Sequence, residues 1–136
     1  MPLHLLKLAV GIDSLDHLRH VRAARQAERG GSWVYTRNHP RRAQEVLAGG
    51  SIYWIIRGQI RVRQQITGFR RECDDNGRRR CRIEVDERLF PTLPRPWRPF
   101  QGWRYLSPMD APEDCGDAGE PPSDRLLAEL RLLGLI

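Results

Sequence analysis

The spacing of hydrophobic residues predicts a buried strand and then an amphipathic helix at the start of the chain. Residues 3–10 are almost continuously apolar and end at Gly11, which is typical of a buried strand. Asp13 then offers an N-cap for a helix that continues to about residue 28 and ends at the next glycine pair. The apolar stripe of this helix is formed by Leu15, Leu18 and Val21, and its opposite face carries Arg19, Arg22, Arg25 and Arg29.

The middle of the chain predicts mainly strands, separated by glycines and turns. Residues 32–37 have the aromatic and β-branched content of a strand, and Pro40 is suited to the first turn of a short helix that reaches Ala48. Residues 51–56 give the strongest strand pattern, and a turn follows them. Apolar and cationic residues alternate at the start of 60–66, which predicts a buried face and a face that presents Arg61 and Arg63.

The second half of the chain predicts a hairpin, a connector and two terminal elements. Residues 74–77 (Asp-Asp-Asn-Gly) mark a turn between two strands. The proline-rich residues 91–99 predict an extended connector, and residues 100–106 predict a last strand. Residues 107–122 have the composition of a loop, and Ser123 caps a final leucine-rich helix.

This order of elements predicts an α+β fold, a small curved mixed sheet or open pseudo-barrel with two or three helices. Residues 1–106 are expected to form one basic domain. Residues 107–136 are expected to form an acidic loop and a C-terminal helix that packs on this domain or on a partner. No apolar run approaches the roughly 18 residues of a membrane span. The first residues also lack the basic region and cleavage site of a signal peptide.

The charge distribution predicts an affinity for polyanions. The formal net charge is +6, but residues 1–106 carry 21 Arg and Lys against 10 Asp and Glu, whereas residues 107–136 carry 2 against 7. All the cations except Lys7 are arginines, whose guanidinium groups bind phosphate through two hydrogen bonds and stack on rings. The acidic segment offers an alternative, because it can lie across the basic face and compete for it.

Cysteine usage fits a reducing cytoplasm. The chain has three cysteines and no Cys-x-x-Cys motif. Cys73 and Cys81 flank the predicted turn, but a two-residue loop at Asn76-Gly77 would leave their thiols out of register. We therefore expect free thiols in a cytoplasmic protein.

One candidate binding cluster lies between a predicted strand end and a predicted helix start. Arg37, Asn38, Arg41 and Arg42 would meet there, where unpaired backbone amides favour a phosphate group. The alternative is a solvated helix start with Asn38 as its cap. Arg61 and Arg63 would form the wall of the same cleft.

Two further clusters combine cations with aromatic residues or with a turn. Residues 95–105 interleave arginines with rings, and Trp97, Trp103 and Arg104 are the candidates for stacking on bases. The alternative is that these tryptophans belong to the core. Five arginines surround the predicted hairpin, where they either follow a phosphate backbone or pair with nearby acids: Arg70, Arg71, Arg78, Arg79 and Arg80.

Enzymatic patterns are sparse. His17 and His20 lie one helical turn apart, but no third ligand has recognisable spacing, so we expect neither a metal nor a cofactor. No nucleophile elbow, Walker loop or dinucleotide motif is present. A cysteine nucleophile paired with His39 stays open as an alternative.

The sequence resembles a bacterial family called domain of unknown function 1489. The likeness is carried by residues 36–42 (Thr-Arg-Asn-His-Pro-Arg-Arg) and 49–58 (Gly-Gly-Ser-Ile-Tyr-Trp-Ile-Ile-Arg-Gly), and it extends to residues 3–11 and 94–106. This family name implies no activity. The chain is also similar to PUA-like and ASCH-like domains, in which a short helix and a glycine precede a hydrophobic strand of a pseudo-barrel. That resemblance implies binding of RNA or modified bases in a cleft, although the Gly-x-Lys-x-x-Glu-x-Arg string of the ASCH group is absent.

The sequence therefore predicts a cytoplasmic domain that binds RNA or another polyanion through an arginine-rich cleft. One alternative is a small hydrolase or nucleotide-processing enzyme with a pocket near His39 and Arg37. Another is an accessory subunit, or a homodimer, that docks through the C-terminal helix.

Overall fold

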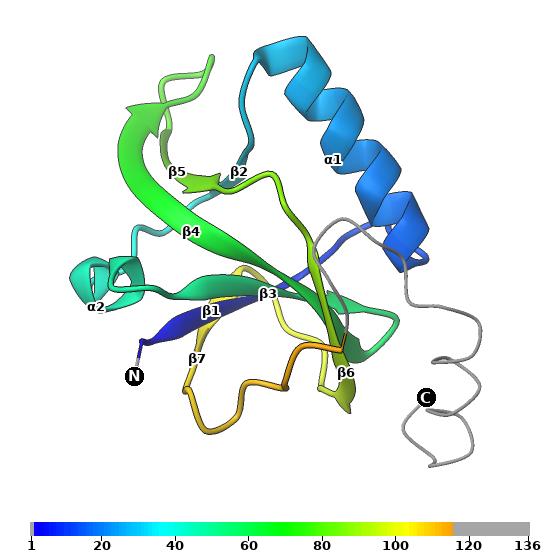
Figure 1. Ribbon diagram of the computed structural model, residues 1–136. Coiled ribbons are helices and arrows are strands. Elements are labelled where there is room, and N and C mark those ends of the chain that lie inside the picture. The colour runs from blue at the N-terminus through cyan, green and yellow to red at the C-terminus, as the bar shows by residue number, and fades with distance from the viewer. Residues whose placement is uncertain (1, 116–136) are drawn as a thin grey trace.

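The computed structural model describes residues 2–115, which form seven strands and two helices (Figure 1). Strands and helices are both present and strands predominate, which confirms the predicted α+β class without specifying a fold family. The predicted C-terminal helix lies outside the described residues. The elements are β1 (His4–Leu8), α1 (Leu15–Arg29), β2 (Trp33–Thr36), α2 (Ala43–Leu47), β3 (Ser51–Ile56), β4 (Gln59–Cys73), β5 (Arg79–Val85), β6 (Phe90–Pro96) and β7 (Trp103–Leu106).

The strands form a mixed, open sheet in the order β2-β5-β4-β3-β1-β7, and β6 also pairs with β4. β1 and β3 are parallel, whereas the other pairs are antiparallel. The first half of β4 lies between β3 and β6, and its second half pairs with β5. Register shifts beside Ile60 and Ile66 interrupt the ladder, and such irregularities let one long strand bend from one part of the sheet into the next.

The sheet has hydrophobic clusters on both faces. The larger cluster includes Leu5, Ile52, Trp54 and Ile83 of the sheet together with Leu15 and Leu18 of α1. The smaller cluster lies on the other face of β1 and β3, where Trp97 and Phe100 pack against it. All six residues of β3 are buried as a result, because both faces of this strand are covered.

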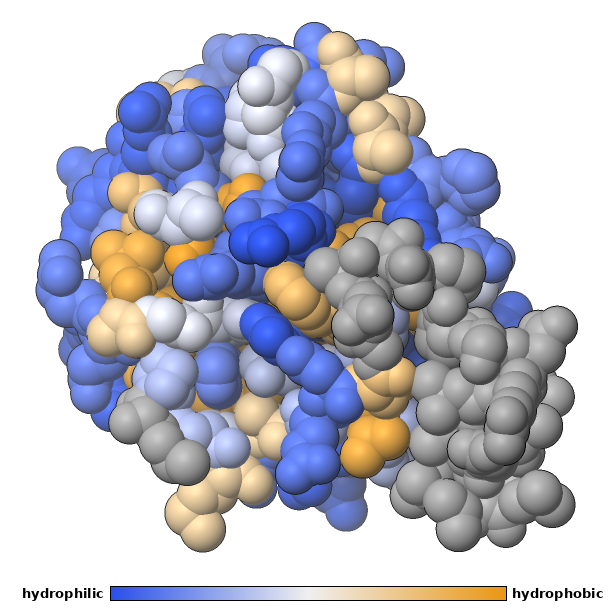
Figure 2. All heavy atoms as spheres, in the orientation of Figure 1, coloured by the Kyte–Doolittle hydropathy of each residue, from blue (hydrophilic) through white to orange (hydrophobic). Residues whose placement is uncertain are grey.

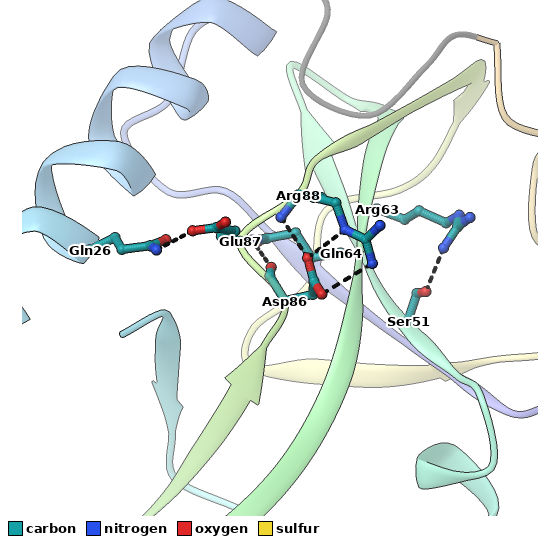
Figure 3. A network of polar contacts seen from close by, with 7 residues as sticks. All are labelled: Gln26, Ser51, Arg63, Gln64, Asp86, Glu87 and Arg88. Carbon is teal, nitrogen blue, oxygen red and sulfur yellow. Dashed lines mark hydrogen bonds and ion pairs between the residues drawn. The ribbon is translucent and has the colours of Figure 1, made fainter. Parts of the chain in front are cut away.

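A buried polar network connects the core to the loop after β5. Gln64 is fully buried, its side-chain carbonyl accepts from the Trp54 indole N–H at 3.0 Å, and its amide donates to the Asp86 carbonyl at 3.0 Å. Its neighbour Arg63 extends to the opposite side of β4, toward Ser51 (Figure 3). Because both polar ends of Gln64 are satisfied, it fixes the register of β4 without an uncompensated polar atom.

Two predictions about helix starts were wrong. Ser14, and not Asp13, caps α1, since its hydroxyl accepts from the His17 N–H at 3.1 Å. α2 begins after residue 42, so Pro40 precedes the helix and is not in its first turn.

The predicted connector at residues 91–99 is largely a strand. β6 carries three prolines, yet it pairs with β4, because a strand on the edge of a sheet tolerates residues that cannot donate. The last strand is also shorter than predicted, since β7 begins only at Trp103.

The hairpin has a longer loop than a two-residue turn. Cys73 pairs with Arg79 and Cys81 pairs with Arg71, so residues 74–78 form the loop. All three cysteines of the chain are among the described residues and are free, as predicted.

Residues 107–115 return across the sheet to β6. Leu93 N–H donates to the Glu113 carbonyl, and Cys115 N–H donates to the Pro91 carbonyl, each at 2.8 Å. The described part of the acidic segment therefore packs on the basic domain.

None of the described helices is long and apolar enough to cross a membrane.

Replacing Gly50 with alanine is expected to lower the free energy of unfolding by about 1–3 kcal/mol. A Cβ atom at this position would collide with the backbone carbonyls of Leu3 and Val46, where β1 and α2 meet. Gly68→Ala is the matched control, because its Cβ would find its nearest neighbour at 3.8 Å, an ordinary contact. Urea denaturation of both variants checks this, and equal midpoints for the two would contradict it.

Candidate nucleic-acid interface

A cavity of about 340 Å³ lies between α1, the end of β1 and β2, and we call it the α1–β2 cavity. Four of its lining residues are cationic, and none of the described residues that line it is acidic. Trp33, Tyr35 and Trp54 supply aromatic walls, and the remaining lining residues are aliphatic. The cations are Lys7, Arg22, Arg25 and Arg29. A partly open cavity with this lining is suited to a group that combines negative charge with an apolar or aromatic body.

Helical geometry brings the three arginines together. Arg22, Arg25 and Arg29 are separated by three and four residues, so they share one side of α1. Arg22 also follows Leu15 by seven positions and Leu18 by four, which places it on the inward stripe of the helix. The prediction that Arg22 lies on the polar face was wrong for this reason.

Arg22 is buried, with only 4% of its surface exposed. One terminal nitrogen, Nη2, donates to the Ser32 hydroxyl at 2.9 Å and to the Trp33 carbonyl at 3.1 Å. Its Nε and Nη1 atoms are also buried and have no hydrogen-bond partner among the described residues. The guanidinium group therefore lacks acceptors for two of its three nitrogens.

The electrostatic environment of Arg22 is unfavourable. Burial, and then the positive charges of Arg25 and Arg29, lower its pKa from the usual arginine value to about 10. At neutral pH the group is charged in the folded and the unfolded chain, so the folded state bears the whole cost of burying it. Buried charges in proteins are normally paired, because an uncompensated one is strongly destabilising. Burial also lowers the pKa of Lys7 in the same cavity.

Beside the cavity, arginines lie over the rings of β2. The guanidinium carbon of Arg82 is 3.6 Å from the Trp33 ring centre, and that of Arg80 is 3.7 Å from the Tyr35 ring centre. Arg29 also lies over Trp33, at 5.2 Å. The face of a ring attracts a cation, and a guanidinium plane can itself stack on a nucleic-acid base. Figure 2 shows that hydrophilic residues cover most of the visible face, with smaller hydrophobic areas between them.

The cluster predicted at residues 37–42 is partly neutralised. Arg37 pairs with Asp74 at 3.0 Å, and Arg42 forms a two-point ion pair with Glu45. This pairing raises the pKa of the Arg42 guanidinium, mainly through the hydrogen bonds to Glu45. Arg41 is exposed.

Asn38 does not cap α2. The N-cap position belongs to Arg42, which makes no capping bond through its side chain. The backbone carbonyl of Asn38 instead accepts from the Trp103 indole N–H at 2.9 Å, and the Tyr105 hydroxyl accepts from the Arg42 N–H at 3.1 Å. The structure therefore brings Trp103 to this cluster.

The other predicted residues lie apart from the α1–β2 cavity. Arg63 donates twice to Asp114, at 2.7 and 2.8 Å, and once to Ser51. Arg61 is half-buried beside the register shift in β4.

Two of the predicted stacking residues lie near the smaller hydrophobic cluster. Trp97 packs on this cluster, and Arg104 lies over Phe100 at 5.1 Å and donates to backbone carbonyls. Both predicted stacking tryptophans are half-buried.

His39 lies against a thiol and a ring. Its Nδ1 atom is 3.5 Å from the Cys81 sulfur, and its ring meets the Phe69 ring edge-on at 5.7 Å. Burial, and then the charge of Arg71, lower the pKa of His39. Burial raises the pKa of the Cys81 thiol, which keeps it protonated and weakly nucleophilic.

The described residues contain no group of three histidine, cysteine or acidic side chains arranged to hold a metal ion. His17 uses its Nδ1 atom to accept from the Asp13 N–H at 3.2 Å, close to the start of α1. In the described structure, this hydrogen bond ties the His17 side chain to the segment that precedes α1.

Comparison with known families matches residues 5–136 to a family described as Protein of unknown function (DUF1489). The resemblance carried by residues 36–42 and 49–58 is thereby confirmed. No curated protein and no solved structure matches the chain.

Replacing Arg22 with methionine is expected to leave the unfolding free energy within about 1 kcal/mol of the unsubstituted protein, or to raise it. Methionine removes the uncompensated charge but keeps an unbranched chain of similar length, and the lost hydrogen bonds are worth only about 1 kcal/mol each.

Leu18→Ala, one turn away on the same buried face, serves as the comparison and is expected to lose about 2–5 kcal/mol. Urea denaturation measures both variants. If Arg22→Met costs as much as Leu18→Ala, Arg22 is a structural support and not a binding group.

Proposed function

The chain belongs to the DUF1489 family of proteins of unknown function, and we propose that it binds single-stranded RNA through the α1–β2 cavity and the adjoining arginines of β5. The observation that carries this proposal is the buried guanidinium of Arg22, which has no carboxylate partner among the described residues. Its Nε and Nη1 atoms are closed to solvent in the described structure, so a phosphate oxygen would supply the acceptors that they lack once the side chains around Arg22 move aside.

The composition of the cavity supports a nucleotide over a small inorganic anion. Lys7 and the three arginines provide positive charge, while Trp33 and the aliphatic residues provide an apolar wall for a base. Arg80 and Arg82 add guanidinium planes outside the cavity, held by Tyr35 and Trp33. Positive charge with flat stacking surfaces is the combination used by proteins that bind single strands.

The dimensions of the cavity favour a single strand over a duplex. A volume of about 340 Å³ accepts a small ligand or one unit of a polymer, whereas a double helix offers only its outer phosphates and groove edges. Unpaired strands expose bases that can enter such a space.

We also propose a PUA-like arrangement of the sheet and a cytoplasmic location. The short helix α2 and the glycine pair before the buried strand β3 support a PUA-like arrangement of the open sheet. The three free thiols support a cytoplasmic location.

Binding of an eight-nucleotide single-stranded RNA is expected to weaken steeply as the salt concentration rises. For single strands, the logarithm of the affinity falls against the logarithm of the salt concentration with a slope of about −0.7 for each phosphate contacted. In the double variant Arg25→Gln/Arg29→Gln, the slope should become shallower by about 1.4, because two phosphate contacts are lost. Fluorescence titrations at several KCl concentrations measure this.

The double variant Arg98→Gln/Arg104→Gln is the matched control. It removes the same charge from exposed positions outside the cavity, so its slope should equal that of the unsubstituted protein. A flat salt response would reject RNA binding. A larger loss in the Arg98/Arg104 variant would move the interface to the surface around Trp97.

A further inference from the structure

A second cationic cavity lies at the β4–β5 hairpin, and we call it the hairpin cavity. It has a volume of about 290 Å³ and is lined by Arg37, Arg71, Arg79 and Arg80, with His39, Glu72 and Cys73. Figure 1 shows the hairpin extending beyond β2, away from β1 and β3. Four cations thus face one carboxylate at a distance from α1.

Two of these arginines have no counter-charge. Glu72 lies 4.0 Å from Arg80, and Asp74 pairs with Arg37 at 3.0 Å while its other oxygen accepts from the N–H groups of the hairpin loop. Arg71 and Arg79 are exposed and form no ion pair with any described residue. Asp75, in the exposed hairpin loop, has no ion-pair partner among the described residues, but the five arginines of this region (Arg37, Arg71, Arg78, Arg79 and Arg80) outnumber its three acids (Glu72, Asp74 and Asp75).

A third hollow lies along β2, between the two cavities. This hollow has a volume of about 190 Å³ and is lined by Tyr35, Thr36, Arg37, Asp74 and Arg80. It shares Tyr35 with the α1–β2 cavity, and it shares Arg37 and Arg80 with the hairpin cavity. The three spaces therefore follow one another along a single strand of the sheet.

We infer that the hairpin cavity binds the phosphodiester backbone of the same strand whose other end occupies the α1–β2 cavity, an inference that rests on the proposed function. β2 has four residues and so spans about 13 Å, at roughly 3.3 Å per residue. A stacked strand covers this length with about four nucleotides, at roughly 3.4 Å each. The neutral imidazole of His39 adds a hydrogen-bonding group beside Arg71.

Length-dependent binding separates this inference from the proposed function. The probes are single-stranded oligouridylates of three and eight nucleotides, titrated into the full chain. In the variant Arg71→Gln/Arg79→Gln, the affinity for the octamer should fall about tenfold and its salt slope should become shallower by about 1.4, while the trimer is unaffected. Arg25→Gln/Arg29→Gln should weaken both lengths. Arg98→Gln/Arg104→Gln is the control of equal charge.

Each outcome of these titrations bears on one of the two proposals or on both. The hairpin site is overturned if Arg71→Gln/Arg79→Gln leaves the affinity for the octamer unchanged. It is also overturned if this variant lowers the affinities for the trimer and the octamer by the same factor. If either result appears while Arg25→Gln/Arg29→Gln still weakens binding, the proposed function stands without the second site. If the unsubstituted protein binds neither oligonucleotide at low salt, both proposals fail. All the exchanged arginines are exposed, and equal urea midpoints show that the variants remain folded.

Discussion

A guanidinium group buried without a carboxylate is the constraint around which the rest of this structure is organised. Arg22 is held between α1 and the start of β2 by two hydrogen bonds to Ser32 and Trp33, and these bonds fix the helix against the strand. The same placement leaves two nitrogens without acceptors and surrounds them with like charges. An apolar side chain there would avoid this cost, so the unpaired charge is the observation on which the proposed RNA site rests.

The distribution of ion pairs separates structural arginines from available ones. Asp114 and Asp110, from the acidic segment, pair with Arg63 and Arg95, so these two arginines of the basic domain are neutralised within the chain. The arginines of α1 that line the α1–β2 cavity have no such partner within it. The net charge is therefore a poor guide to how many arginines are free to contact a polyanion. The positions of the acids determine where a polyanion can bind.

Much of the fold could be predicted from the sequence, because local patterns determine it. The apolar runs at β1 and β3, the amphipathic helix and the hairpin turn all carry periodic or turn-forming residues. β6 was predicted as a connector because prolines lower strand propensity, and only the pairing with β4 makes the edge position tolerable. For Arg22, the spacing from Leu15 and Leu18 indicated burial, but the charge of the side chain argued against it. The pairing of Arg42 with Glu45 has a local i,i+3 spacing that the sequence offers, whereas the pairing of Arg63 with Asp114 depends on a tertiary contact that no local pattern encodes.

The state of the Arg22 side chain in solution tests this account most directly. Nuclear magnetic resonance of arginine side chains, recorded while single-stranded RNA is added, follows its Nε–H group individually. The account predicts that this resonance shifts and exchanges more slowly with water at saturation, since a phosphate oxygen becomes its acceptor. An Nε–H resonance that stays unchanged while RNA binds elsewhere on the protein would contradict it.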